Sequence, residues 1–162
     1  MDKTLKDYLK KNRIDCKEHK HPAVFTVAES KKIKKNTGKH TKCLFIKDEK
    51  SNFYLVAMEA EKRLDMKNLK ERLKAKKLSF ASSEQLKEQL NLTPGSVSIF
   101  GMIHAKKVSL VIDKKVWEAE KVGFHPNINT STLELTHEAL ERFVCRSNRN
   151  VLPIIHNVSY VS

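Results

Sequence analysis

The sequence lacks the features of several large classes of protein. No apolar run is long enough to span a membrane, and the N-terminus leads into an amphipathic pattern without an apolar signal region. The three cysteines are far apart and form no CxxC pair, which excludes a zinc ribbon and a thioredoxin-type motif. An odd number of cysteines without a signal peptide indicates reduced thiols, so we expect a cytoplasmic protein with no membrane partner.

The motifs of cofactor binding and covalent catalysis are also missing. The sequence contains no Walker A loop, no GxGxxG, no HExxH and no Gly-x-Ser-x-Gly. A Ser/His/Asp triad cannot be assembled from it, and the cysteines have no motif around them. We therefore expect neither a cofactor nor a metal ion.

Positive charge is in excess. Lys and Arg number 32 against 19 Asp and Glu in 162 residues, which gives a formal net charge of +13. Such an excess is typical of proteins that bind a polyanion, most often nucleic acid, although a lysine-rich proteome produces the same composition. The excess is in lysine, which suits contact with phosphates better than the reading of bases.

The order of apolar and polar segments predicts one α+β domain over residues 1–162. Apolar runs at 43–46 and 53–58 predict two strands joined by a polar hairpin loop at 47–52. Further strands are expected at 108–112, 121–124, 132–135 and 151–155, with an edge strand or loop at 17–22. Helices are expected around 66–73 and after the caps Asp2, Thr26, Ser82 and Thr136. The aromatic residues lie mostly inside apolar runs and are expected in the core: Phe45, Phe53, Tyr54, Phe80, Phe124 and Phe143.

Three segments have side chains or backbone suited to binding or chemistry. Lys42 immediately precedes the run 43–46, so its ammonium can lie at the edge of a pocket and hold a phosphate or a developing oxyanion. The loop Leu92–Gly101 contains two glycines, which let backbone N–H groups approach a ligand. The stretch Phe124–Glu134 combines His125 with two amides and three hydroxyls, and His125 could be a general base, a hydrogen-bond donor or a structural clamp. Each segment also has an ordinary explanation, as a solvated lysine, a helix-to-strand connection and a turn.

Taken together, four segments resemble one family and occur in its order: His21–Val27, Thr41–Asp48, Leu92–Ser98 and Gly123–Thr132. From about His19 to Ile155 the chain is similar to YbaK-type and prolyl-tRNA-synthetase-associated aminoacyl-tRNA editing domains. The resemblance is to the free-standing prolyl-tRNA editing branch, which removes alanine mischarged onto proline tRNA.

The resemblance implies a mixed β-sheet flanked by helices, and hydrolysis of the ester between an amino acid and the terminal adenosine of tRNA. It implies catalytic roles for Lys42, for Gly95 in a loop whose amides hold the ester, and for His125. Substrate contacts are then expected from Phe25, Thr26, Ser96, Val97, Ser98, Asn129 and Thr132. Candidate contacts for the tRNA phosphates are Lys31, Lys32, Lys34 and Lys35, and also Lys74, Lys76 and Lys77.

Two positions depart from the family pattern. The loop proline of the family is Ile99 here, and Ile128 stands where many members have Thr or another polar residue. Both bear on the amino acid preferred rather than on the reaction, which needs a positioned water and a stabilised oxyanion but no covalent nucleophile. Ala, Cys and Ser remain open as the amino acid removed.

The resemblance thus predicts an editing enzyme that acts on proline tRNA, with prolyl-tRNA synthetase as a possible partner. Other interpretations of the sequence stay open. The chain could be a catalytically silent tRNA-binding or regulatory module. It could also be an N-terminal editing domain cut from a larger prolyl-tRNA synthetase. A basic RNA-binding domain without a pocket is a third alternative, and it predicts exposed aromatic side chains on a sheet face.

Overall fold

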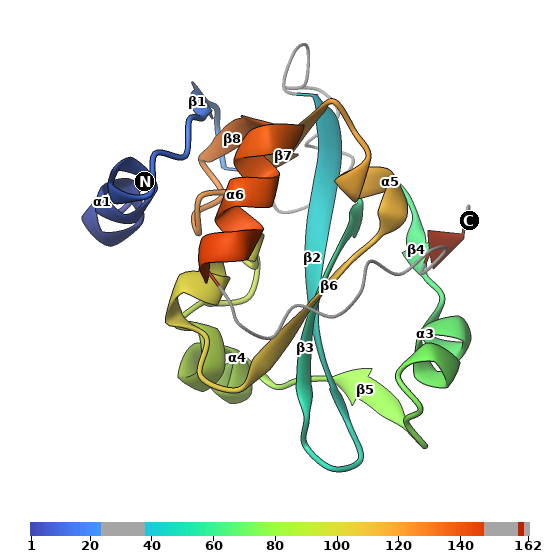
Figure 1. The fold of residues 1–162 in the computed structure, drawn as a ribbon. Helices are drawn as coiled ribbons and strands as arrows, with labels where there is room; N and C mark the ends of the chain where they lie inside the picture. Colours follow the sequence, from blue (N-terminus) through green and yellow to red (C-terminus); the bar gives the residue numbers. More distant parts are fainter. Residues whose placement is uncertain (24–37, 148–158, 161–162) are drawn as a thin grey trace.

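A mixed β-sheet of seven strands forms the centre of the structure (Figure 1). The computed structural model describes residues 1–23, 38–147 and 159–160. The strands of the sheet are β1 Lys17–Lys20, β2 Lys39–Asp48, β3 Phe53–Glu59, β5 Leu78–Phe80, β6 Val108–Ile112, β7 Lys121–Phe124 and β8 Ser131–Thr136. They follow the order β1-β8-β7-β2-β3-β6, and β5 pairs with β2 outside this path. A separate antiparallel pair consists of β4 Arg63–Leu64 and β9 Ser159–Tyr160.

Several helices begin where the sequence offers a side-chain cap. Asp2 caps α1 (Lys3–Lys11), and Ser82 forms a capping box on α4 (Ser83–Leu90). The hydroxyl of Thr136 accepts a hydrogen bond of 3.2 Å from the amide of Ala139 at the start of α6 (His137–Ser147). Further helices are α3 (Met66–Arg72), the 3-10 helix η1 (Ile99–His104) and α5 (Lys114–Trp117). Among the helices described, none has the length and hydropathy needed to cross a membrane.

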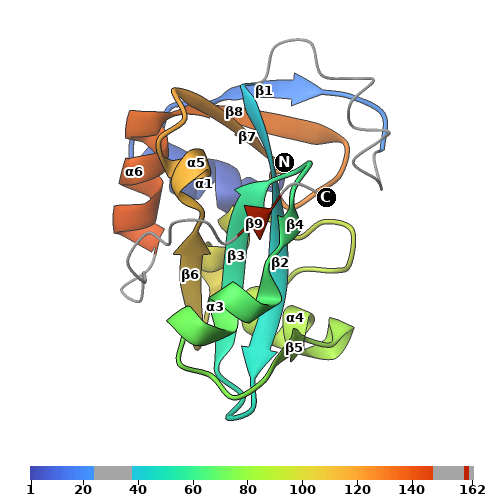
Figure 2. The same cartoon turned by 90° about the vertical axis from the view of Figure 1, so that its right-hand side faces the viewer.

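Alternate residues of the central strands point to opposite faces of the sheet. On one face, here called the major face, Cys43 and Phe45 of β2 join the core formed with α1, α4, η1, α5 and α6. On the other, the minor face, Ile46 of β2 joins a smaller cluster that includes Val56 of β3 and Leu69 of α3. Figure 2 shows α3 in front of β2 and β3. The strand β2 is therefore buried on both faces over its second half.

Two different strands share one edge of β2. Strand β3 pairs with residues 41–47 along the other edge. Residues 39–40 pair in parallel with β7, and residues 46–48 pair in antiparallel with β5. Since β3 pairs along one edge of β2, both β7 and β5 must pair along the opposite edge. Between them, residues 41–44 have no strand partner on that edge within the described part of the chain, and we call these four residues the unpaired edge.

The α+β class, the mixed sheet and the 47–52 connection of β2 to β3 agree with the sequence expectations, with three differences in detail. Strand β2 begins at Lys39, before the apolar run, because pairing with β7 extends it. Strand β5 is not predicted, since three residues give too short a pattern to recognise. Residues from Ile99 form η1, where the sequence predicts a loop.

The expectation that Phe80 belongs to the core is wrong. Its side chain is 62% exposed, although the register places it opposite Ile46, which is fully buried. Leu78, at the other end of β5, packs against the minor-face cluster, whereas Phe80 is the last residue of this strand at the margin of the sheet and lies outside that cluster. The predicted helix after Thr26 and the predicted strand at 151–155 lie outside the described residues.

Gly38 allows β2 to start close to β7. Its φ of +74° is in the left-handed region, and a Cβ at this position would lie 2.7 Å from the carbonyl carbon and oxygen of Lys121. The backbone would have to move to relieve that contact. Because the pairing of Lys39 with Val122 follows immediately, Gly38 controls how closely the two strands approach.

We expect Gly38→Ala to lower the free energy of unfolding by about 1–3 kcal/mol, through both backbone strain and the contact with Lys121. Gly38→Asn separates the two causes, because Asn tolerates a positive φ but also has a Cβ. Similar losses in both variants, measured by urea unfolding, indicate that the contact dominates. A Gly38→Ala protein as stable as the parent contradicts the prediction.

Candidate functional site

Lys42 and His125 lie just beyond the point where β2 and β7 separate. The parallel register pairs Lys39 with Val122 and His40 with Gly123. Lys42 and His125 each follow the last paired residue of their own segment by two residues. The hydroxyl of Thr41 donates a 2.6 Å hydrogen bond to the carbonyl of Gly123, which holds the strands together at their last paired residues.

Both side chains lie on the minor-face side of the sheet. Cys43, which follows Lys42, and Phe124, which precedes His125, are both buried in the major-face core. Since successive side chains of a strand alternate, Lys42 points to the opposite side, and the chain leaves β7 with His125 directed the same way. The same alternation places Thr132 on this side, because Leu133 is in the major-face core.

The loop before η1 also lies at this site, next to the end of β7. Residues 93–96 form a turn in which the amide of Ser96 donates to the carbonyl of Thr93, and Gly95 has a φ of +85°. Farther along, the buried hydroxyl of Ser98 donates to the carbonyl of His125. The loop is therefore fastened to the end of β7, and the glycine turn at its tip is exposed.

Two histidines from opposite ends of the chain meet in this site. His125 Nδ1 lies 3.0 Å from the carbonyl oxygen of Ser131, and His21 Nδ1 lies 2.8 Å from that of Pro22. Carbonyl oxygens only accept, so in the neutral rings both Nδ1 atoms carry the proton. His21 Nε2 then accepts from the Thr132 hydroxyl at 2.9 Å, and the two rings are in edge-to-face contact at 5.9 Å between centroids. In that tautomer the lone pair of the His125 ring is on Nε2.

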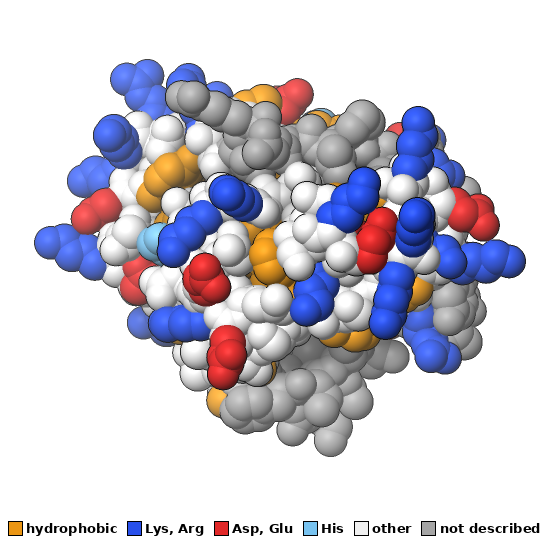
Figure 3. Space-filling model, turned by 90° about the horizontal axis from the view of Figure 1, so that it is seen from below, with side chains coloured by type: hydrophobic (Ala, Val, Ile, Leu, Met, Phe, Trp, Pro, Cys, Tyr) orange, Lys and Arg blue, Asp and Glu red, His pale blue; other side chains and the backbone are white. Residues whose placement is uncertain are grey.

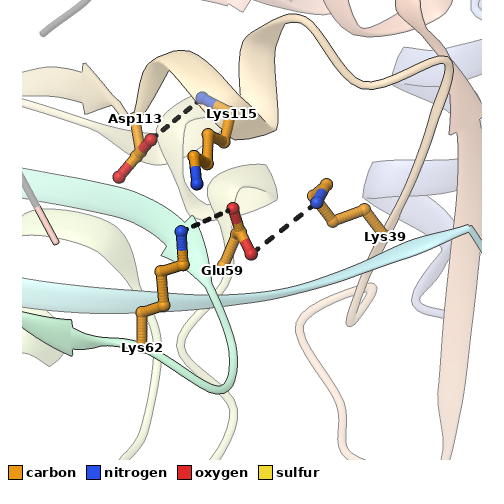
Figure 4. Close-up of polar contacts among 5 residues, drawn as sticks. All are labelled: Lys39, Glu59, Lys62, Asp113 and Lys115. Carbon is orange, nitrogen blue, oxygen red and sulfur yellow. Dashed lines mark hydrogen bonds and ion pairs between the residues drawn. The ribbon is translucent and has the colours of Figure 1, made fainter. Parts of the chain in front are cut away.

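Lys42 differs electrostatically from the lysines around it. Burial lowers the pKa of the Lys42 ammonium, and the nearby charge of Arg63 lowers it further. Within the described residues Lys42 has no ion pair. Lys39 and Lys62, in contrast, lie 3.6 Å and 3.2 Å from the two oxygens of Glu59 (Figure 4). Lys42 is thus a half-buried cation next to another cation, an arrangement that a negatively charged or strongly polarised ligand would stabilise.

The neighbouring thiol is unsuited to nucleophilic chemistry. Burial raises the pKa of Cys43 to about 12, and a hydrogen bond from the Ile99 backbone opposes this rise without cancelling it. The thiolate is the reactive form, so Cys43 stays protonated and unreactive at neutral pH. No group of three or more His, Cys, Asp or Glu side chains in the described ranges is placed to hold a metal ion.

The structure brings together part of the site that the sequence predicts. Ser98, His125 and Thr132 are linked directly or through His21, and Lys42 lies on the same side of the sheet. Ser96, Val97 and Asn129 are half-buried in the adjoining loops. The predicted residues that lie outside the described part of the chain are Phe25, Thr26, Lys31, Lys32, Lys34 and Lys35.

The two departures from the family pattern lie in different environments. Ile99 is fully buried in the major-face core, so its side chain contributes to packing and does not line the site. Ile128 is half-buried in the loop that follows His125.

Sequence reasoning missed three residues of this region. His21 bonds Thr132 across 111 positions of sequence, a distance that no local pattern reveals, although His21 opens the first segment of the resemblance. Arg63 acts on Lys42 through space from β4. Asn127 has a φ of +62° and a buried amide oxygen with no hydrogen-bond partner in the described region, which makes that oxygen available to a ligand.

A family model described as the aminoacyl-tRNA editing domain matches residues 21–143. The chain belongs to this family. The match runs from His21 through Lys42, Ser98, His125 and Thr132, and so includes every residue of the site assembled above.

Named relatives and solved structures agree with this assignment. The chain is 37% identical to the prolyl-tRNA editing protein ProX of Acetoanaerobium sticklandii over 83% of this chain and 84% of that protein. It is 31% identical to the prolyl-tRNA synthetase associated domain-containing protein 1 of Danio rerio, over 88% of this chain and 80% of that protein.

Two crystal structures share the fold. The structure of the hypothetical protein APE2540 superposes with a TM-score of 0.78 at 19% identity and covers 98% of this chain and 100% of that one. A candidate trans-editing enzyme for prolyl-tRNA synthetase gives a TM-score of 0.71 at 17% identity, over 94% of this chain and 96% of that one. At these identities the likeness concerns the fold, and it supports a single α+β editing-domain architecture.

The electrostatic environment of Lys42 gives a direct prediction. Arg63→Gln should raise the pKa of Lys42, because it removes the repelling charge, yet leave it below the ordinary value, because burial is the larger cause. The pKa can be followed by NMR titration of the lysine side chains, with Lys42→Arg to identify the resonance. An unchanged titration of Lys42 in Arg63→Gln contradicts this description of the site.

Proposed function

We propose that this protein is a trans-editing hydrolase that deacylates mischarged proline tRNA, with Ala-tRNAPro as its substrate. The observation that carries the proposal is Lys42, a half-buried ammonium without an ion pair in the described residues, which lies in the unpaired edge of β2 just beyond the pairing with β7. The name of the Acetoanaerobium relative, a prolyl-tRNA editing protein, supports the choice of tRNA. Residues 1–162 would act as one editing domain in the cytoplasm, on tRNA that prolyl-tRNA synthetase has mischarged.

The reaction is the addition of water to the ester carbonyl carbon, followed by cleavage of the bond to the ribose oxygen. The products are the free amino acid and a tRNA with its terminal hydroxyl restored. An aminoacyl ester is already activated, so the protein needs to stabilise the oxyanion and to position the water. Neither task requires a covalent nucleophile, which is consistent with the protonated state of Cys43.

Lys42 is the group we assign to the developing negative charge. An ammonium held in a half-buried position interacts with an oxyanion more strongly than a solvated one, because less water screens the attraction. The repulsion from Arg63 favours the same outcome, since an anion between the two cations relieves it. Backbone amides of the loop that contains Gly95 are the second candidate donors, because the turn exposes them at its tip.

His125 is the group we assign to the water. Its Nδ1 donates to the carbonyl of Ser131, and in this tautomer the lone pair that a general base uses is on Nε2. The contact with His21 and the bond from Ser98 to the His125 backbone hold the ring in place. A ribose hydroxyl of the substrate next to the ester would help to orient the same water.

Selection of alanine over proline would follow from size and shape. A small site admits Ala and excludes a bulkier ring, which is the second step of a double sieve. Ser and Cys differ from Ala by little volume, so polarity near Ile128 would decide among the three.

The test is deacylation of proline tRNA charged with Ala, Cys, Ser or Pro. We expect rapid loss of Ala and no loss of Pro with the native protein. Lys42→Met, which keeps the apolar stem but removes the charge, should lower the rate about a hundredfold or more. Lys50→Ala, in the exposed turn after β2, is the matched control and should keep full activity.

Each result has a definite meaning. Preference for Cys or Ser retains the reaction but changes the substrate. Full activity in Lys42→Met, with an unchanged melting temperature, contradicts the role assigned to Lys42. No hydrolysis of any of the four esters, with tRNA still bound, leaves a binding module and contradicts the catalytic proposal.

A further inference from the structure

Phe80 is the large hydrophobic side chain that the described part of the chain leaves exposed, at 62%. A single exposed aromatic residue is common on soluble proteins and needs no special explanation by itself. The position of Phe80 relative to Lys42, however, makes it a candidate for binding the same ligand.

Phe80 and Lys42 lie on the same face and along the same edge of β2. Phe80 is paired with Ile46, and directly paired residues of neighbouring strands point to the same face. Ile46 is four residues beyond Lys42, so its side chain is also on the minor-face side, about 13 Å farther along the strand. The unpaired edge separates the two, and the half-buried Leu44 lies between them on this face. A ligand that follows this edge from Lys42 therefore reaches Phe80.

The surroundings of Phe80 are basic. Lys76 and Lys77 immediately precede β5 with exposed side chains. The backbone amides of Lys76 and Lys77 both donate to Glu49, at 3.0 and 3.2 Å, which fixes the segment that carries these side chains. Figure 3 shows Lys and Arg side chains spread over the side of the molecule with the β2–β3 hairpin, and fewer acidic ones. An exposed ring among cations matches the chemistry of an unpaired nucleotide, which has an apolar base and an anionic phosphate.

We propose that Phe80 stacks against an unpaired base of the single-stranded acceptor end of the tRNA, upstream of the terminal adenosine. This inference rests on the proposed function, because it takes the ester at Lys42 as the fixed point. Lys76 and Lys77, which precede β5 on the side of Phe80 away from Lys42, contact the phosphates beyond that base. The edge of β2 thus fixes the orientation of the acceptor strand. The ester lies next to β7, and the preceding nucleotides run toward β5.

Binding of uncharged RNA minihelices tests the proposal without relying on hydrolysis. One minihelix ends in the single-stranded acceptor sequence, and a second is blunt because it lacks those nucleotides. Phe80→Ala should weaken binding of the first about 5- to 100-fold and leave the weaker binding of the blunt one unchanged. Phe80→Trp should keep the affinity, and its added indole fluorescence should be quenched when the single-stranded end binds.

Phe80→Leu is the matched control for apolar contact. It retains bulk and hydrophobicity but has no aromatic face, so stacking predicts a loss close to that of Phe80→Ala. Affinity equal to the native protein in Phe80→Ala overturns the proposal, as does an equal loss for both minihelices. A native dimer that Phe80→Ala converts to a monomer in sedimentation also overturns it, because the exposed ring would then belong to a contact between copies.

Failure of this inference is distinguishable from failure of the proposed function. If Phe80→Ala binds both minihelices normally while the native protein deacylates Ala-tRNAPro, only the role of Phe80 is wrong. If Phe80→Ala loses the single-stranded end while the native protein hydrolyses nothing, the contact is supported and the catalytic proposal is wrong.

Discussion

The division of one edge of β2 between β7 and β5 is the constraint on which the site depends. A strand paired along its whole length on both edges would present only side chains to a ligand, on two faces already filled by the hydrophobic clusters. Here the pairing of β2 with β7 ends at residue 40, and its pairing with β5 begins at residue 46. Gly38 permits the close approach at the first end, and Thr41 fastens it by its bond to Gly123. Residues 41–44, the unpaired edge, therefore have no strand partner on this side within the described structure, and Lys42 lies near one end of them.

The charge distribution follows from the same arrangement. Glu59 forms ion pairs with both Lys39 and Lys62, whereas Lys42 points to the opposite face of the sheet and has no such partner among the described residues. Burial and Arg63 lower the pKa of Lys42, so a negative ligand at this position would stabilise its charged form. The many other lysines produce a basic surface that attracts a polyanion at long range but does not determine where the chemistry occurs.

The sequence predicts the fold class and most elements because each has a local signal. The caps at Asp2, Ser82 and Thr136 and the apolar runs of β2 and β3 are examples, and the structure has all of them. Strand β5 has no such signal, since its three residues become a strand only by pairing with β2. The wrong expectation for Phe80 has the same cause, because a segment as short as Leu78–Phe80 does not reveal that it lies at the margin of a sheet.

The residues of the site likewise fall into two groups, those indicated by their own sequence segments and those identified only by contacts in the folded structure. Lys42, Ser98, His125 and Thr132 lie in the sequence segments of the resemblance. The structure links Ser98 to His125 and puts Lys42, His125 and Thr132 on the same side of the sheet. His21 and Arg63 escaped residue-level reasoning, because their contacts with Thr132 and Lys42 exist only once β1 and β4 are in place. The assignment to the editing-domain family needed all four segments in order, since each one alone is compatible with an ordinary turn or strand.

The central claim is that the ester is held at the unpaired edge of β2, between β7 and β5. The most direct test is a crystal structure with a stable analogue of alanyl-adenosine, in which an amide replaces the ester. The account predicts the carbonyl oxygen within hydrogen-bond distance of Lys42 Nζ, with the alanyl group toward His125. An analogue bound on the major face, or with its carbonyl away from Lys42, would contradict it.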